Sequence, residues 1–135
     1  MIKYMNLIGI KARKASEYKV TTEVKNKVLN DYAKLIKNEK KFIINQNSKD
    51  INYARKKGLK ENLIKRLHLN ENKLNGIVNS IFKIAKLRNP IDNTLDKWKR
   101  PNGLNIKRVS IPIGVIGVIY ESRPNVTSDV ASLCF

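Results

Sequence analysis

The sequence has few of the features that mark secreted, disulfide-bonded or membrane-spanning proteins. It contains one cysteine, Cys134, in 135 residues, which excludes an internal disulfide and is typical of a reducing compartment. Its longest apolar run ends at Tyr120 and is shorter than the roughly 18 residues that a membrane span needs. The N-terminus has neither a long apolar segment nor a small-residue cleavage site. We therefore expect a cytoplasmic globular protein with no membrane segment.

Acidic residues are also scarce: 11 Asp and Glu stand against 28 Lys and Arg, which gives a formal charge of +17. Such a charge can indicate nucleic-acid binding. However, the excess is mostly Lys and accompanies many Asn and Ile, as A/T-rich codons would produce. The lysines are scattered, and no zinc-finger, RNP or Gly-x-x-Gly clamp motif is present. A solvated basic surface is the favoured interpretation, and a small basic nucleic-acid-binding or scaffold domain is the alternative.

Residues 1–90 have mainly helical periodicity. Thr21 or Thr22 can cap a long amphipathic helix, and a helix over residues 48–57 should end with Gly58 in the left-handed C′ position. Asn70 is the expected N-cap of a helix that Pro90 stops. The first long helix has an apolar face of Val24, Val28, Tyr32, Leu35 and Ile36, and the last has one of Leu74, Ile77, Val78, Ile81, Ile84 and Ala85.

After Pro90 the pattern changes to that of strands. The tight turn Pro101-Asn102-Gly103 predicts a β-hairpin over residues 95–111. The second strand does not alternate cleanly, which allows a bulge. Residues 113–120 are apolar throughout, as in a strand that is buried on both faces, and residues 126–135 suit a helix. The fold class is therefore α/β, and the central strand lacks parallel neighbours, so the chain resembles the front of a larger protein.

The polar segment Glu121-Ser122-Arg123-Pro124-Asn125 follows the predicted buried strand. Ligands bind at the carboxyl ends of strands in open α/β sheets. Arg123 can hold a phosphate or carboxylate, and the Asn125 amide could stabilise an oxyanion. The structural alternative is that Asn125 caps the following helix, while Arg123 pairs with Glu121 or Asp129. From the residues alone, this alternative is favoured.

Five other residues of potential interest have structural explanations. Gly114 and Gly117 lie inside the predicted strand, where they indicate close backbone packing rather than a phosphate loop. Cys134 has no adjacent base or cation to lower its pKa and is interpreted as a small core residue. His68 has no metal or triad partner at a readable spacing. We also interpret Trp98, beside the hairpin turn, as a packing residue.

Several segments together resemble the γ-glutamyl phosphate reductases, the glutamate-5-semialdehyde dehydrogenases of the aldehyde dehydrogenase superfamily. They are Arg100-Pro101-Asn102-Gly103-Leu104 and Ile111–Thr127, with support from Ala12-Arg13-Lys14-Ala15 and Asn89-Pro90-Ile91. The resemblance covers essentially the whole chain, and Tyr120–Thr127 is its most specific part. It implies the N-terminal part of an aldehyde dehydrogenase-like fold, with the first strand and helix of the nucleotide-binding domain.

The resemblance also implies a function in proline biosynthesis. This function is the NADPH-dependent reduction of L-glutamate 5-phosphate to L-glutamate 5-semialdehyde, with release of phosphate, by a cytoplasmic homo-oligomer. Asn125 would stand near the reacting carbonyl, and Glu121, Ser122, Arg123 and Pro124 would line the cofactor and substrate cleft. No metal site is implied.

The family's nucleophilic cysteine belongs to a later catalytic domain, so the resemblance implies that Cys134 is not the nucleophile. We expect an N-terminal fragment that is inactive alone. The front of a bifunctional synthase with an upstream kinase domain is a further alternative, against which the starting methionine argues.

Overall fold

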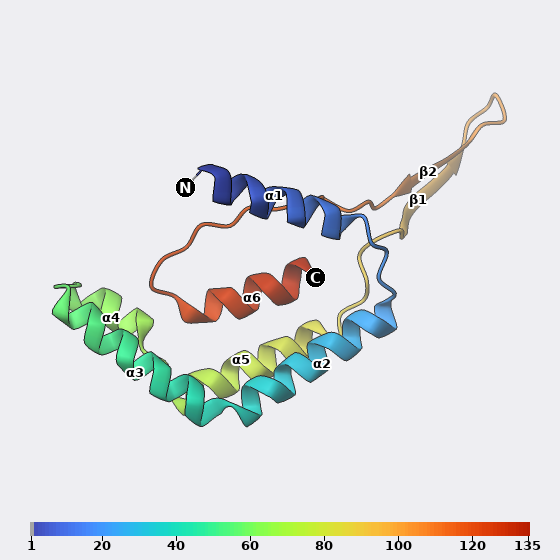
Figure 1. Ribbon diagram of the computed structural model, residues 1–135. Coiled ribbons are helices and arrows are strands. Elements are labelled where there is room, and N and C mark those ends of the chain that lie inside the picture. The colour runs from blue at the N-terminus through green and yellow to red at the C-terminus, as the bar shows by residue number, and fades with distance from the viewer. Residues whose placement is uncertain (1) are drawn as a thin grey trace. The chain divides into compact units, whose positions relative to one another are not determined.

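The computed structural model describes residues 2–135, which form two compact units (Figure 1). One unit contains the chain up to Lys19 together with Arg88–Ile116, and the other contains Val20–Leu87 and Gly117–Phe135. The expected helical region began at residue 1, which lies outside the described residues. None of the helices formed by residues 2–135 is long and apolar enough to cross a membrane.

The first unit consists of helix α1 (Ile2–Ser16) and an antiparallel hairpin of β1 (Thr94–Lys99) and β2 (Asn105–Val109). The hairpin confirms the prediction from the turn sequence. Gly103 has a φ of 89°, and its N–H donates to the Arg100 carbonyl at 2.9 Å, which closes a tight turn. A bulge is present, but it lies in β1 between Thr94 and Asp96 rather than in the second strand.

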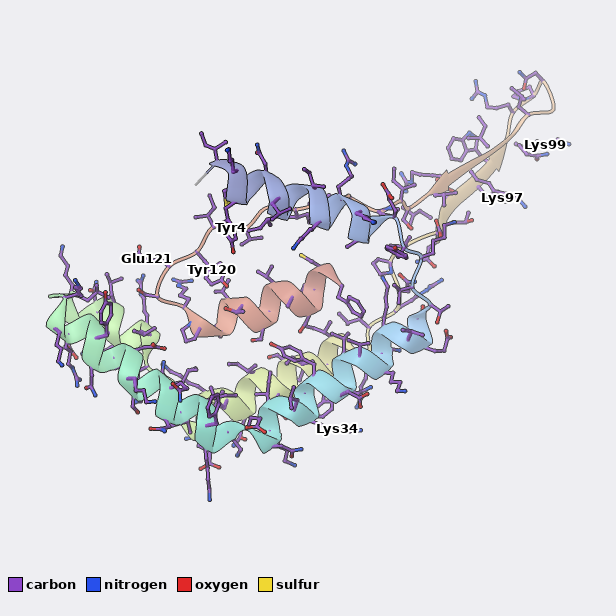
Figure 2. All side chains as sticks on the ribbon, viewed as in Figure 1. Tyr4, Lys34, Lys97, Lys99, Tyr120 and Glu121 are labelled. Atoms are coloured by element: carbon purple, nitrogen blue, oxygen red, sulfur yellow. The ribbon has the colours of Figure 1, made fainter. Side chains whose placement is uncertain are left out.

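The hairpin has no layer packed against it within its own unit. All of β1 is exposed, and Figure 2 shows Lys97 and Lys99 extending from this strand. Trp98 stands opposite Ile106 in the register and is 41% exposed. Cross-strand pairs of this kind stabilise a hairpin, so the packing role of Trp98 stays a prediction.

The second unit consists of five helices, and its main core lies between two of them. The helices are α2 (Thr22–Asn38), α3 (Lys40–Lys56), α4 (Glu61–Leu67), α5 (Glu71–Ile84) and α6 (Pro124–Cys134). Leu74 and Ile81 of α5 are almost fully buried and face Leu29, Ala33 and Ile36 of α2 in one cluster. The predicted apolar stripe of α5 is therefore confirmed.

The predicted apolar face of α2 was only partly correct. Ile36 is buried and Tyr32 is partly buried against the core, whereas Val24, Val28 and Leu35 are exposed. The buried face instead follows Leu29, Ala33 and Ile36. Ala33 is fully buried, and its small side chain lets α2 approach α5 closely at this point.

The predicted helix ends of this unit are largely confirmed. The Val24 N–H donates to Thr21 Oγ1 at 3.4 Å, and the Lys73 N–H donates to Asn70 Oδ1 at 2.9 Å, so both caps form as expected. Gly58 has a φ of 71°, and its N–H donates to the Arg55 carbonyl at 3.0 Å. The next N–H, from Leu59, donates to the Ala54 carbonyl, which completes a Schellman motif. The helix that ends here, α3, begins at Lys40 and not at residue 48.

The prediction of a buried strand over residues 113–120 was wrong. No strand forms there, Ile113 is 90% exposed and Ile119 is fully exposed. A strand needs a neighbour for its backbone hydrogen bonds, and residues 2–135 provide none for this segment. The close packing inferred for the glycines was also wrong, because a Cβ on Gly114 or Gly117 would meet nothing within 4 Å.

Candidate functional site

A concavity of about 310 Å³ lies in the second unit, where the start of α6 meets α5 and the end of α4. It is open to solvent, and its walls carry charged, polar and apolar side chains. Its volume falls at the lower end of the range of small-molecule sites. The lining residues are Arg66 and Leu69 near the end of α4, Lys73, Gly76, Ile77 and Ser80 of α5, and Pro124, Asn125 and Asp129 of α6.

The buried side chain of Asn47 fixes the wall formed by the α4–α5 link. Its Nδ2 donates to the Leu67 carbonyl at 2.9 Å, and its Oδ1 accepts the Leu69 N–H at 2.8 Å. The nitrogen and the oxygen of the Asn47 amide are therefore both hydrogen-bonded to the backbone of residues 67–69, which fixes this segment. On the other side of the link, Lys73 Nζ donates to the carbonyl of His68 at 2.6 Å, which places a cation at the negative end of α4.

Helix α6 positions Asn125 on the opposite wall. The helix starts at Pro124, a residue whose fixed φ and missing N–H suit the first helical position, and Arg123 is its N-cap residue. The expectation that Asn125 caps this helix was therefore wrong, because Asn125 lies inside the first turn. Its Nδ2 donates to Asp129 Oδ2 at 3.1 Å, and the Ser128 Oγ donates to its carbonyl at 2.8 Å.

The three charged side chains on the walls of the concavity, Arg66, Lys73 and Asp129, lack a counter-ion among residues 2–135. Asp129 is partly buried and has no cation within 4.0 Å among residues 2–135. Its negative charge, after the larger effect of burial, helps to raise the pKa of Tyr32 on α2. Arg66 is exposed and makes no hydrogen bond or ion pair with any residue that the structure describes.

The structure separates the predicted site residues into two groups. Pro124 and Asn125 line the concavity, whereas Glu121, Ser122 and Arg123 do not. Figure 2 shows Tyr120 and Glu121 on the segment that leads into α6. Ser122 has a φ of 50°, a left-handed conformation that is uncommon outside glycine.

The Arg123 side chain is exposed, and within residues 2–135 it pairs with neither Glu121 nor Asp129. The pairing that the sequence allowed is therefore not formed.

The remaining candidates are not part of this concavity. Cys134 is exposed on the last turn of α6, so the prediction that it is a core residue was wrong. His68 is exposed and serves as the C-cap residue of α4. No group of three metal-ligating side chains occurs within residues 2–135.

Sequence reasoning missed most of the charged wall. Arg66 and Lys73 carry no sequence signal that separates them from the other cations of the helices. Asp129 had one, its spacing of four residues from Asn125, because residues at i and i+4 share one face of a helix.

Comparison with known proteins places the chain in a family. It is 47% identical over 113 residues to a gamma-glutamyl phosphate reductase of Nautilia profundicola and 40% identical over 133 residues to one of Persephonella marina. The alignments cover 84% and 97% of the chain, respectively. The chain belongs to the gamma-glutamyl phosphate reductase family. No family model matches it.

Two solved structures of the same enzyme have the same fold as the chain. The Thermotoga maritima gamma-glutamyl phosphate reductase superposes over 91% of the chain with a TM-score of 0.82 at 38% identity. The Saccharomyces cerevisiae enzyme superposes over 93% with a TM-score of 0.87 at 29% identity. The fold is thus that of the N-terminal part of an α/β, aldehyde dehydrogenase-like enzyme, as the resemblance implied. The chain spans about a third of the length of these proteins, 30% and 33%, and of the two curated relatives, 28% and 30%.

Proposed function

We propose that the chain is part of a glutamate-5-semialdehyde dehydrogenase that uses NADPH and acts in proline biosynthesis. In this reaction L-glutamate 5-phosphate, NADPH and a proton give L-glutamate 5-semialdehyde, NADP⁺ and phosphate. The observation that carries the proposal is the similarity to proteins named gamma-glutamyl phosphate reductase over 97% of the chain in one alignment. The position of Asn125 in a concavity that α5 and α6 form together supports it.

Asn125 has the chemistry to assist the reaction at the acyl group. A side-chain amide carries two N–H donors, and one of them is used by Asp129 Oδ2 at 3.1 Å. The second is free to donate to the acyl oxygen, which gains negative charge when the carbonyl is attacked. The hydrogen bond to Asp129 would hold the amide in one orientation, so that little reorganisation is needed at the moment of reaction.

The segment before α6 has groups that fit an anionic nucleotide. Arg123 presents a guanidinium without a partner in the described part of the chain, and a guanidinium matches phosphate geometry. The first N–H groups of α6 are available to an anion as well. We therefore assign Glu121, Ser122, Arg123 and Pro124 to the lining of the cofactor cleft. When bound, NADPH supplies the hydride.

The chain alone should be inactive, because it holds no suitable nucleophile. Its only cysteine, Cys134, is exposed at the C-terminal end of α6 and lies outside the concavity that holds Asn125. The proposal further includes a cytoplasmic location and self-association of the complete protein. Exposed apolar side chains on the hairpin, such as Leu104 at 60%, support self-association.

The test uses the complete polypeptide that contains residues 1–135. NADPH oxidation is followed at the nicotinamide absorbance with L-glutamate 5-phosphate as substrate, and the phosphate released is measured in parallel. Asn125→Ala should lower kcat about 100-fold, as the loss of one oxyanion donor does elsewhere. Asn62→Ala is the matched control, since Asn62 is exposed on α4 and should leave the rate unchanged. Equal rates for the two variants would reject the role of Asn125, and a wild-type protein without activity would reject the reaction.

A further inference from the structure

The concavity at the start of α6 carries two cations, Arg66 and Lys73, and one anion, Asp129, none of which forms an ion pair within residues 2–135. Arg66 comes from the end of α4 and Asp129 from the second turn of α6. Neither Arg66 nor Asp129 forms an ion pair within residues 2–135, and the hydrogen bond that Asp129 accepts comes from the neutral amide of Asn125. Asp129 is partly buried and is held by a neutral amide rather than by a cation, so its carboxylate offers an unneutralised negative charge to a positively charged ligand group.

We propose that this concavity recognises the amino-acid end of the substrate: Asp129 binds the α-ammonium group and Arg66 binds the α-carboxylate. The inference rests on the proposed function and assigns two residues of its substrate site. A zwitterionic ligand carries one positive and one negative group, which match the Asp129 carboxylate and the Arg66 guanidinium, respectively. A simple anion such as phosphate would face the Asp129 carboxylate, and an apolar ligand would leave both charges without partners.

The spacing of Asn125 and Asp129 along α6 fits the length of the glutamyl group of the substrate. Asn125 and Asp129 are joined by a side-chain hydrogen bond and lie four residues apart, which corresponds to a rise of about 6 Å along the helix. This separation is comparable to the distance between the α-nitrogen and the acyl oxygen of an extended glutamate, the two atoms that would contact Asp129 and Asn125. A substrate whose ammonium group contacts Asp129 can therefore reach the free N–H of Asn125 with its acyl oxygen.

Asp129 has enough acceptor capacity for both partners. An ionised carboxylate accepts at two oxygens, and the Asn125 amide uses Oδ2. Oδ1 is then available to the ammonium group. Lys73, the other cation of the concavity, already donates to the carbonyls of Lys65 and His68, which leaves Arg66 as the carboxylate partner.

The test compares two aldehydes in the oxidative direction with the complete polypeptide, NADP⁺ and phosphate. One is L-glutamate 5-semialdehyde, and the other is 5-oxopentanoate, which has the same length but lacks the α-ammonium group. Asp129→Asn keeps the shape of the side chain and removes its charge. We expect KM for the first aldehyde to rise about 10- to 100-fold, as for the loss of one partner of a desolvated charge pair, with KM for 5-oxopentanoate unchanged. Asp31→Asn on α2, where Asp31 is exposed and 3.6 Å from Lys34, is the matched control.

The outcomes distinguish ammonium recognition from a purely structural role. If Asp129→Asn impairs both aldehydes equally, Asp129 acts only by holding Asn125, and the inference is wrong. If it impairs neither, the inference is also wrong.

A calorimetric titration of the complete polypeptide with L-glutamate and with glutarate separates this inference from the reaction itself. Without any dehydrogenase activity, a preference of tenfold or more for L-glutamate that Asp129→Asn abolishes would retain the ammonium site and reject the reaction. Absence of that preference would overturn the inference in either case.

Discussion

Replacing Asn47 by Ala should strongly destabilise the helical unit. Asn47 is 5% exposed, and its amide makes two hydrogen bonds, of 2.9 Å to the Leu67 carbonyl and 2.8 Å from the Leu69 N–H. Each bond contributes about 1 kcal/mol net, and a buried group left without a partner costs a further 1–3 kcal/mol or so. The sum is a loss of about 3 to 5 kcal/mol in the free energy of unfolding, which is a large fraction of the stability of an ordinary domain.

The assay is urea unfolding followed by far-UV circular dichroism, together with hydrogen exchange at the Leu69 amide. Ser48→Ala is the matched control: its neighbouring hydroxyl donates to the Ile44 carbonyl at 3.0 Å from an exposed position, and its loss should change the free energy of unfolding by less than about 0.5 kcal/mol. In Asn47→Ala the Leu69 amide should exchange faster than its neighbours in α5.

Asn47→Asp gives a second, pH-dependent test of the same contacts. The new carboxylate can accept the Leu69 N–H but cannot donate to the Leu67 carbonyl, so burial should raise its pKa in the folded state. The folded protein then binds more protons than the unfolded one, and stability should increase as the pH falls through the folded-state pKa. An Asn47→Ala protein with unchanged stability and a protected Leu69 amide would refute this account of the link.

Three further changes test other parts of the chain. Gly58→Ala forces a side chain into the left-handed conformation with a φ of 71° and should cost about 1–2 kcal/mol in unfolding by urea, whereas Gly9→Ala, inside α1 with nothing within 4 Å, should be neutral or stabilising. Lys40 donates to Glu71 at 2.7 Å and lowers the pKa of that carboxyl. Any stabilisation of the folded protein by this pair is present above the pKa of Glu71 in the unfolded state, and it is lost as the pH falls through the pKa of Glu71 in the folded state. Lys40→Met should therefore move the Glu71 titration measured by NMR to higher pH, and an unmoved titration would contradict the pairing. Ile119→Lys should reduce self-association in sedimentation experiments without lowering the helix unfolding midpoint, because Ile119 is fully exposed; equal association would point to another surface.

The sequence correctly predicted those caps and turns that depend only on residues close by in the chain. The caps Thr21 and Asn70 and the left-handed Gly58 depend on neighbours within a few residues, and all three were correct. The hairpin turn at Gly103 belongs to the same class. The buried face of α2 could not be read in the same way, because the choice between Val28 and Leu29 depends on where α5 packs and not on the periodicity of α2 itself.

The candidate site was predicted in part for the same reason. Asn125 could be identified because it directly follows the apolar segment and Pro124, a local arrangement. Arg66 reaches the same concavity only through the packing of α5 between the end of α4 and α6, which no local pattern encodes. The expected role of Asn125 as a cap was wrong because Pro124 takes the first helical position, so that α6 starts two residues earlier in the sequence than expected.

The segment over residues 113–120 and the concavity depend on different surroundings. The apolar segment is exposed because no strand within residues 2–135 pairs with it, and its sequence suits a burial that other strands must provide. Asn125 and Asp129, in contrast, are fixed by the hydrogen bond between them and by the packing of α6 on α5. If the proposed site is correct, the chain can therefore hold the amino-acid end of the substrate without the sheet. Under the proposed function a nucleophile must attack the acyl carbon, and Cys134, exposed at the end of α6, lies outside the concavity. Binding and catalysis should therefore be separable, so that L-glutamate binding persists in a protein that reduces nothing.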